Sequence, residues 1–438
     1  MTRLPAVLAR SVLAAAIVVS VALVVGPSKS PRPVGPVRLS DFQVDDLHMV
    51  SASLGWAVDG ITGDVLHTAG SAESWQVVDP PGKPPLGYLS APVFFLGEAR
   101  AWAAMAGSGP SEIAVARTSD GGSRWTRGPS LDPLSGMDSG LPAGDSMIVG
   151  TVTLDFATAQ AGWLAVGLGE ESTAGQPRTG TGTGLVLYRT TDGGAEWSTE
   201  VRFTPLTRQQ AGLGSGCASP GIVFTSPTRG WDTGTCLEQT SDGGLTWQKV
   251  APPAPPGVST AQWRRRACGS QASFASVRVG WLALECSIPT AAGGTAQVQV
   301  VYQTSDGGAE WVPREVPVRW PSLPPTYDTP GGPDLGGRAW LLGVTARQLR
   351  DARPGTLSQE LYETADGGAR WRLVDPALPA DSVDFVSAQL GFAVRACFGA
   401  VVGCSTPLLL ETEDGGVSWV QLHPLLVRGR LASPLPYL

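Results

Sequence analysis

Histidine is scarce in this chain of 438 residues, where only His48, His67 and His423 occur. So few imidazoles leave little room for a histidine-rich metal site or a Ser-His-Asp triad. Charged residues are also few, at 16% of the chain, and the net charge of −7 argues against the basic surface that a general nucleic-acid binder needs. We therefore expect no metal, no cofactor and no nucleic-acid partner.

Glycine and proline are abundant instead. The 56 glycines and 37 prolines are too many for a helical bundle, whereas a hydrophobic content of 42% is too high for a disordered protein. At roughly 100–200 residues per domain, the length fits two or three domains or one large repetitive domain.

The N-terminal segment has the pattern of an export signal. Arg3 and Arg10 precede the apolar run Ser11–Val25, which is short for a membrane span. No small-x-small cleavage site follows the run, so residues 1–26 are predicted to be either a signal peptide or an uncleaved membrane anchor, and residues 27–40 a proline-rich linker. We expect the protein outside the cytoplasm, either anchored by this segment or secreted.

One octapeptide of the pattern Thr-x-Asp-Gly-Gly-x-x-Trp organises the rest of the chain. Its aspartate occurs in six copies, at Asp120, Asp192, Asp242, Asp306, Asp366 and Asp414. A seventh, degenerate copy is Thr68–Trp75, where Gly70 replaces the aspartate. Successive copies are 48 to 72 residues apart, a period typical of propellers or arrays of small sheets.

A second signature accompanies the octapeptide: an apolar or aromatic residue stands seven positions before another aromatic residue. Six units carry it, at Met49/Trp56, Phe95/Trp102, Phe156/Trp163, Phe224/Trp231, Phe274/Trp281 and Phe385/Phe392. The constant spacing predicts two strands, A and B, joined by a tight turn, and the octapeptide predicts a turn between strands C and D. Seven such units predict an all-β, seven-bladed propeller of four-stranded antiparallel blades over residues 41–438. The expected blades are 41–80, 87–130, 148–203, 217–252, 268–316, 334–375 and 382–425.

The octapeptide aspartates are predicted to be structural. An aspartate accepts hydrogen bonds from amides of its own turn, and glycine supplies the positive φ that other residues resist. A calcium loop needs several oxygen ligands at alternate positions, whereas each octapeptide offers one carboxylate followed by two glycines.

The octapeptide resembles the Asp-box (BNR repeat) of sialidases, sortilin-type receptors and photosystem II assembly-factor propellers. Together with the aromatic pairs, it most resembles the photosystem II assembly-factor group, which implies a seven-bladed, exported propeller. The resemblance covers residues 41–423. The residues that carry it are those that build blades, so it implies the fold more strongly than a function.

The six cysteines fit strand pairs of the same blades. In blades four and five, one cysteine stands at the predicted start of strand A and another near the end of strand B, positions that face each other in an antiparallel pair. In blade seven the two cysteines fit strands B and C. The predicted disulfides are Cys217–Cys236, Cys268–Cys286 and Cys397–Cys404. The absence of a Cys-x-x-Cys motif favours disulfides over a metal or redox site, and such bonds persist outside the reducing cytoplasm.

Because consecutive strands of a blade run in opposite directions, alternate connections lie on the same face of the propeller. The A–B and C–D connections share one face and are short, whereas the B–C and D–A connections share the other face and are expected to carry every long insertion. The long stretches are predicted at 128–147, 205–216, 250–266 and 317–337 (D–A) and at 165–184, 287–296 and 343–358 (B–C). Long loops on a rigid frame often carry binding sites, so this face is predicted to bind a partner.

Of 15 tryptophans, only two belong neither to an octapeptide nor to strand B, and both are expected in D–A connections. One of them precedes three arginines, the densest positive charge of the chain. Tryptophan and arginine are enriched at interface hot spots, and the family resemblance also implies an arginine-rich binding surface. The candidate partner-binding residues are Trp263, Arg264, Arg265, Arg266, Trp320, Arg347 and Arg350. The alternative interpretation is that Trp263 packs in the core and the arginines pair with local acids.

The leading hypothesis is a non-enzymatic extracytoplasmic scaffold, expected to be a monomer, that docks a protein partner such as a membrane or envelope protein through the long-loop face. A second hypothesis is a sialidase-like glycosidase, although the chain has only six tyrosines and lacks an Arg-Ile-Pro motif. A third is glycan or cell-wall binding without hydrolysis, with Trp263 and Trp320 as stacking platforms.

Overall fold

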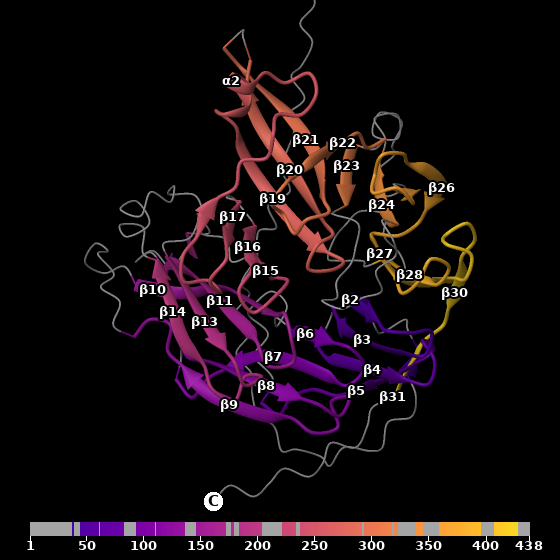
Figure 1. Cartoon of the computed structure of the whole chain (residues 1–438). Coiled ribbons are helices and arrows are strands. Elements are labelled where there is room, and N and C mark those ends of the chain that lie inside the picture. The colour runs from indigo at the N-terminus through magenta and orange to yellow at the C-terminus, as the bar shows by residue number, and fades with distance from the viewer. Residues whose placement is uncertain are drawn as a thin grey trace, which may run out of the picture. The chain divides into compact units, whose positions relative to one another are not determined.

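Seven β-sheets, each built on four antiparallel strands, follow one another along the chain in the computed structural model (Figure 1). The predicted seven-bladed propeller of four-stranded blades is confirmed. The structure describes residues 37–38, 44–60, 62–82, 93–109, 111–135, 146–171, 177–178, 184–203, 221–233, 237–290, 293–317, 319–322, 338–344, 359–395 and 407–427. The predicted signal or anchor segment, residues 1–26, lies outside these ranges. Within them, no helix combines the length and the apolar character that a membrane crossing requires.

Each blade contains strands A to D in chain order. Blade one comprises β2 (Val44–Met49), β3 (Leu54–Asp59), β4 (Val65–Ala69) and β5 (Ser74–Val77). Blade two comprises β6 (Val93–Leu96), β7 (Arg100–Ala106), β8 (Ile113–Thr118) and β9 (Thr126–Leu131). Blade three comprises β10 (Ser146–Phe156), β11 (Gly162–Glu171), β13 (Gly184–Thr190) and β14 (Ser198–Phe203), with β12 (Pro177–Arg178) paired to β11.

The remaining blades have the same order. Blade four comprises β15 (Gly221–Phe224), β16 (Gly230–Thr233), β17 (Glu238–Thr240) and β18 (Gln248–Lys249). Blade five comprises β19 (Ala267–Phe274), β20 (Gly280–Pro289), β21 (Thr295–Thr304) and β22 (Val312–Arg314). Blade six comprises β23 (Arg319–Ser322), β24 (Ala339–Val344), β25 (Gln359–Thr364) and β26 (Arg372–Leu378). Blade seven comprises β27 (Ser382–Phe385), β28 (Gly391–Arg395), β29 (Leu408–Thr412) and β30 (Val420–Leu422).

The seven-residue aromatic spacing corresponds to the hairpin between strands A and B, as predicted. In blade three, Phe156 lies opposite Gly162 and Asp155 lies opposite Trp163. A Cβ atom on Gly162 would come within 2.2 Å of the Phe156 ring, so the position opposite this ring has to be glycine. The small residue before the strand-B tryptophan is therefore part of the hairpin.

The strand-B tryptophan packs on the next blade. Trp163 of blade three stacks on Phe224 of blade four, and its Nε1 donates to the Gly243 carbonyl of that blade's octapeptide at 2.8 Å. Trp247, which ends the same octapeptide, meets the Phe224 ring edge-on. The two sequence signatures thus meet between blades, and each blade completes the core of its neighbour.

The octapeptide aspartates close their own turns. Asp306 accepts the Thr304 hydroxyl at 2.8 Å and the Glu310 amide at 2.9 Å, while the Thr304 hydroxyl accepts the Gly308 amide. The hydrogen bond from the Glu310 amide lowers the pKa of Asp306. Five other aspartates bind the threonine hydroxyl and the backbone amide of their turns in the same way: Asp120, Asp192, Asp242, Asp366 and Asp414.

The end of the chain joins blade one. The strand β31 (Leu425–Val427) runs parallel to β5, and β1 (Val37–Arg38) pairs with β31, so the sheet of blade one has six strands. Phe392 of blade seven belongs to the same buried cluster as Met49 and Trp75 of blade one. Blade seven and blade one are therefore connected both by the backbone and by the core.

Blade six begins earlier than the sequence predicts. Its strand A is β23, which pairs antiparallel with β24. The predictions that this blade starts near 334 and that Trp320 lies in a D–A connection are therefore wrong. Most of the predicted long stretch 317–337 lies outside the described residues. The spacing signature fails here because Pro333, instead of an aromatic residue, stands seven positions before Trp340.

Candidate partner-binding site on blade five

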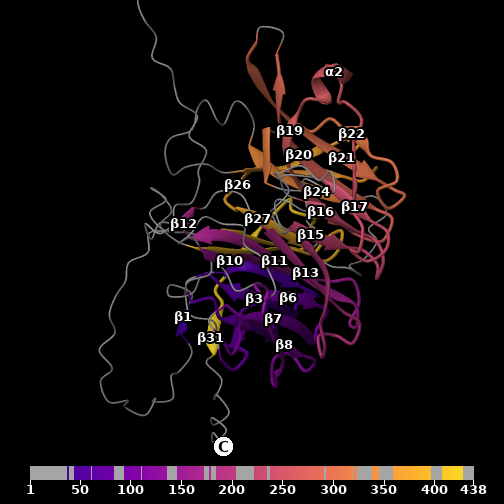
Figure 2. The same cartoon turned by 90° about the vertical axis from the view of Figure 1, so that its left-hand side faces the viewer.

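The connection between blades four and five folds against the long hairpin of blade five. It contains the short helix α2 (Thr260–Trp263), which lies near the ends of β19 and β20 in both views (Figures 1 and 2). Ser259 begins the helix, because its hydroxyl accepts the Gln262 amide while the Gln262 side chain accepts the Ser259 amide. Gln262 also donates to the Pro289 carbonyl at the end of β20, which joins the helix to the hairpin.

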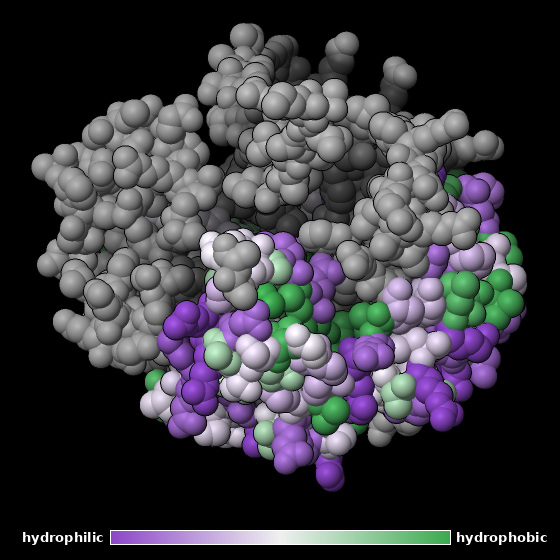
Figure 3. Space-filling view, turned by 90° about the horizontal axis from the view of Figure 1, so that it is seen from above, coloured by the Kyte–Doolittle hydropathy of each residue, from purple (hydrophilic) through white to green (hydrophobic). Residues whose placement is uncertain are grey.

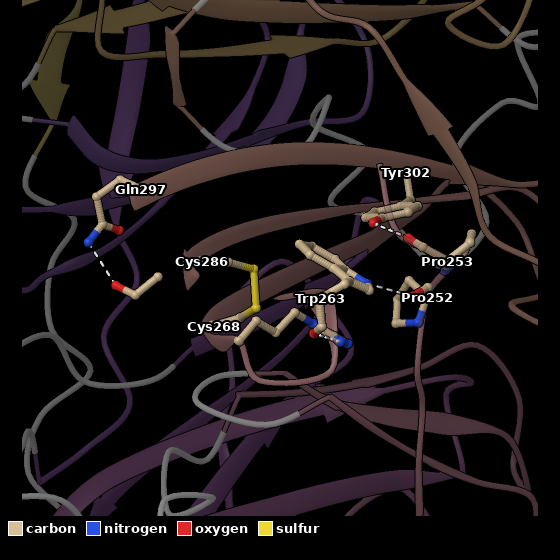
Figure 4. Close-up of a disulfide and its surroundings, with 9 residues drawn as sticks. Pro252, Pro253, Trp263, Cys268, Cys286, Gln297 and Tyr302 are labelled. Atoms are coloured by element: carbon tan, nitrogen blue, oxygen red, sulfur yellow. Dashed lines mark hydrogen bonds between the residues drawn. A yellow bond between two sulfur atoms is a disulfide. The ribbon is translucent and has the colours of Figure 1, made fainter. Parts of the chain in front are cut away.

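Trp263 anchors the helix in the core of blade five. Its side chain is 3% exposed, and its Nε1 donates to the Pro252 carbonyl at 2.8 Å (Figure 4). The Tyr302 hydroxyl donates to the adjacent Pro253 carbonyl at 2.7 Å, and burial raises the pKa of Tyr302. An indole whose N–H has an acceptor is buried at little cost. Trp263 is therefore a core residue, as in the alternative interpretation, and the predicted surface role for its ring is corrected.

The three arginines after Trp263 lie in different environments. The Arg266 guanidinium lies 4.4 Å from the centroid of the Trp263 ring, and its Nη1 donates to the Trp263 carbonyl at 2.8 Å. Partial burial lowers the pKa of Arg266. Arg264 and Arg265 are exposed. Arg266 thus holds the helix, whereas the other two guanidinium groups face solvent.

The other candidate binding residues do not join this site in the described structure. Trp320 belongs to β23, and the structure describes its backbone but not its side chain. Arg347 and Arg350 lie entirely outside the described residues. The predicted extension of the basic patch therefore stays a prediction.

A disulfide holds the two strands next to α2. Cys268 of β19 and Cys286 of β20 are opposite each other in the register and are bonded (Figure 4). The predicted Cys268–Cys286 pair is present, whereas Cys217, Cys236, Cys397 and Cys404 lie outside the described residues. Because the bond lies at the end of β19 that follows α2, it constrains the backbone that carries the arginines.

A cavity of about 540 Å³ lies beside the same hairpin. Its walls come from the prolines that precede α2, from β20 and β21, and from β22 with the chain that follows it. It is lined by Pro255, Pro256, Pro313, Glu285, Gln297, Val298, Gln299, Val300, Arg314, Glu315 and Val316. This volume is in the usual range of ligand sites, roughly 300–1,000 Å³.

The described part of the chain has no arrangement of three or more histidine, cysteine, aspartate or glutamate side chains that suits a metal ion.

On the described part of the face shown in Figure 3, hydrophobic side chains form small groups separated by hydrophilic ones. Recognition on such a surface depends on placed charges and hydrogen bonds more than on apolar area.

No family model matches this chain, and no curated protein matches it. Among solved structures, YCF48 from Cyanidioschyzon merolae is similar, with 16% identity over 90% of this chain and 97% of that chain and a TM-score of 0.42. The GH74 xyloglucanase from Xanthomonas campestris has 12% identity over 87% of this chain and 79% of its own, with a TM-score of 0.30. The alpha-L-arabinanase from Penicillium chrysogenum has 13% identity over 76% of this chain and 96% of its own, with a TM-score of 0.37.

These similarities bear on two predictions made from the sequence. The predicted resemblance to photosystem II assembly-factor propellers is confirmed for the fold alone, since YCF48 is among the similar structures. The prediction that the chain is not an enzyme is corrected, because glycoside hydrolases and an ulvan lyase are among the similar structures, so the propeller fold does not exclude an enzyme. At these TM-scores no similarity carries an argument for a function, so the proposal below rests on the residues of blade five.

Proposed function

We propose that this propeller docks a protein partner through Arg264 and Arg265 at the end of α2. The observation that supports the proposal is an exposed pair of guanidinium groups on a backbone that is already ordered. That backbone is held by the buried indole of Trp263, by the Gln262–Pro289 hydrogen bond, and by the reciprocal hydrogen bonds between Ser259 and Gln262. Contact residues that are ordered before binding lose less entropy on association, and arginine is frequent at interface hot spots.

The expected partner presents an acidic surface. The chain as a whole carries a net charge of −7, so a local pair of arginines orients an acidic partner toward blade five. We place the interaction outside the cytoplasm, where a disulfide such as Cys268–Cys286 persists. The partner is then an extracytoplasmic protein, for example a membrane or envelope protein.

A charge reversal tests the proposal. The full chain carrying Arg264→Glu and Arg265→Glu is compared with the unmodified chain as bait in envelope extracts, and captured proteins are quantified. We expect recovery of the partner to fall by about tenfold or more, equivalent to about 1.4 kcal/mol. We also expect recovery by the unmodified chain to fall as salt increases.

The matched control carries Arg124→Glu and Arg278→Glu. Both arginines are exposed and lie in a C–D and an A–B connection, on the face opposite α2. This control should capture the partner as the unmodified chain does. Equal capture by the chain with reversed Arg264 and Arg265 would show that these arginines do not dock the partner.

A further inference from the structure

In the described part of the chain, the outer edge of β21 in blade five is only partly paired. The short strand β22 pairs with Val301–Gln303, whereas β21 begins at Thr295. Among the strands that the structure describes, none lies beside the outer edge of β21 at Thr295–Val298. The inner edge is paired with β20 along its whole length. An uncovered edge presents backbone amides and carbonyls that can pair with an added strand.

The blade-five cavity lies along this edge. Gln297 donates to the Ser287 hydroxyl across one face of the sheet at 2.7 Å, whereas Val298 packs against the Trp263 core on the other face. Successive strand residues point to opposite faces, yet Gln297 and Val298 both line the cavity. A cavity that reaches both faces lies at a strand edge, and β20 occupies the inner one. The cavity therefore lies at the outer edge.

The walls of the cavity leave this edge open to an incoming strand. Pro255, Pro256 and Pro313 have no backbone N–H, so they cannot donate to the carbonyls of β21. Together with Val316 they form an apolar wall suited to the side chains of an added strand.

The charged lining favours a basic group. Glu285 and Glu315 contribute two exposed carboxylates. The only guanidinium among the lining residues is that of Arg314, and its Nη2 already donates to Gln303 Oε1 at 3.0 Å. A cation on the incoming segment thus meets carboxylates that outnumber the lining's own positive charge.

We propose that the cavity binds an extended peptide segment of the partner, which adds as a strand to β21 and directs a lysine or arginine toward Glu285 and Glu315. Strand addition supplies affinity through main-chain hydrogen bonds and specificity through alternate side chains. The inference rests on the proposed function, since it assigns the cavity to the partner that Arg264 and Arg265 dock.

A display library of random linear nonapeptides, screened against the full chain, tests the inference. We expect selected peptides to combine apolar residues with a lysine or arginine. In a synthetic peptide, N-methylation at every second residue should abolish binding, because only alternate amides face β21, whereas methylation of the intervening amides should preserve it. Exchange of those Thr295–Val298 amides that face the outer edge of β21 should slow when the peptide binds.

Charge variants complete the test. Glu285→Lys with Glu315→Lys should weaken peptide binding by about tenfold or more. Glu196→Lys with Glu310→Lys, which alters two exposed octapeptide glutamates, should leave it unchanged. Peptides that bind without the alternating N-methyl pattern, or that bind equally to the first charge variant, would overturn the inference. So would a library without binders when a saccharide array shows ligands that the same variant loses.

These experiments distinguish a failure of the proposed docking through Arg264 and Arg265 from a failure of the proposed strand addition. The variant with Arg264→Glu and Arg265→Glu should still bind the isolated peptide, because these arginines do not line the cavity. If envelope capture depends on the arginine pair but no strand-like peptide binding exists, the proposed docking stands and the inference about the cavity falls.

Discussion

Trp163 of blade three lies flat against Phe224 of blade four, with ring centroids 3.5 Å apart and an interplanar angle of 4°. Both side chains are buried, at 0% and 1% exposed. A carboxylate adds to this contact, since Asp155 on strand A of blade three accepts the Phe224 amide. Phe224 therefore joins the two blades through its ring and its backbone, so it is a sensitive position for the stability of the propeller.

Phe224→Ala should lower the free energy of unfolding by about 3–5 kcal/mol. The substitution removes the ring between Trp163 and Trp247 and leaves a cavity between blades. Urea unfolding followed by tryptophan fluorescence measures the loss. The control is Leu373→Ala, at a side chain that is 43% exposed, where a change within about 0.5 kcal/mol is expected. Comparable losses at the two positions would contradict the assignment of Phe224 to the joint between blades.

Thr304→Val should lower the free energy of unfolding by about 1–3 kcal/mol, because the buried Gly308 amide loses its acceptor. The same hydroxyl donates to the Asp306 carboxylate and accepts the Asp306 amide at 3.3 Å, so the turn loses three hydrogen bonds. Differential scanning calorimetry compares this variant with Thr126→Val, which replaces an exposed threonine and should change stability by less than about 0.5 kcal/mol. Indistinguishable melting of the two variants would mean that the octapeptide threonine is dispensable.

Asp155→Asn should reduce the pH dependence of stability. Burial raises the pKa of Asp155 to about 7, against about 3.9 in an unfolded chain. Between these pH values the folded protein holds a proton that the unfolded chain has released, so the free energy of unfolding falls as pH rises, by at most about 1.4 kcal/mol per pH unit. The amide oxygen of asparagine can still accept the Phe224 amide. The variant should therefore gain stability relative to the unmodified chain from pH 4 to pH 7.

Chemical denaturation at a series of pH values measures that difference. Burial lowers the pKa of His48 to about 4, which makes stability rise with pH, but this contribution is common to both proteins and cancels in the comparison. A stability difference that stays constant from pH 4 to pH 7 would show that Asp155 does not titrate in this range.

Local chemistry explains how much of the fold was predictable. Each octapeptide satisfies its aspartate and threonine within its own turn, so the turn and the strands beside it can be inferred from one short stretch. The hairpin spacing is equally local, because Gly162 has to lie opposite Phe156. Blade six was misplaced where this local signal is absent, before Trp340.

By itself, then, the sequence determined the blade type, the number of blades, the octapeptide turns and the Cys268–Cys286 pair, because the residues concerned are close along the chain or opposite in one hairpin. Only the tertiary structure decided that Trp263 is buried while Arg264 and Arg265 are exposed, and that a cavity runs along β21. Those properties depend on Pro252, Tyr302 and Arg314, residues from separate segments that meet only after the blade has formed. No periodicity in the sequence encodes which side of such a connection faces the core.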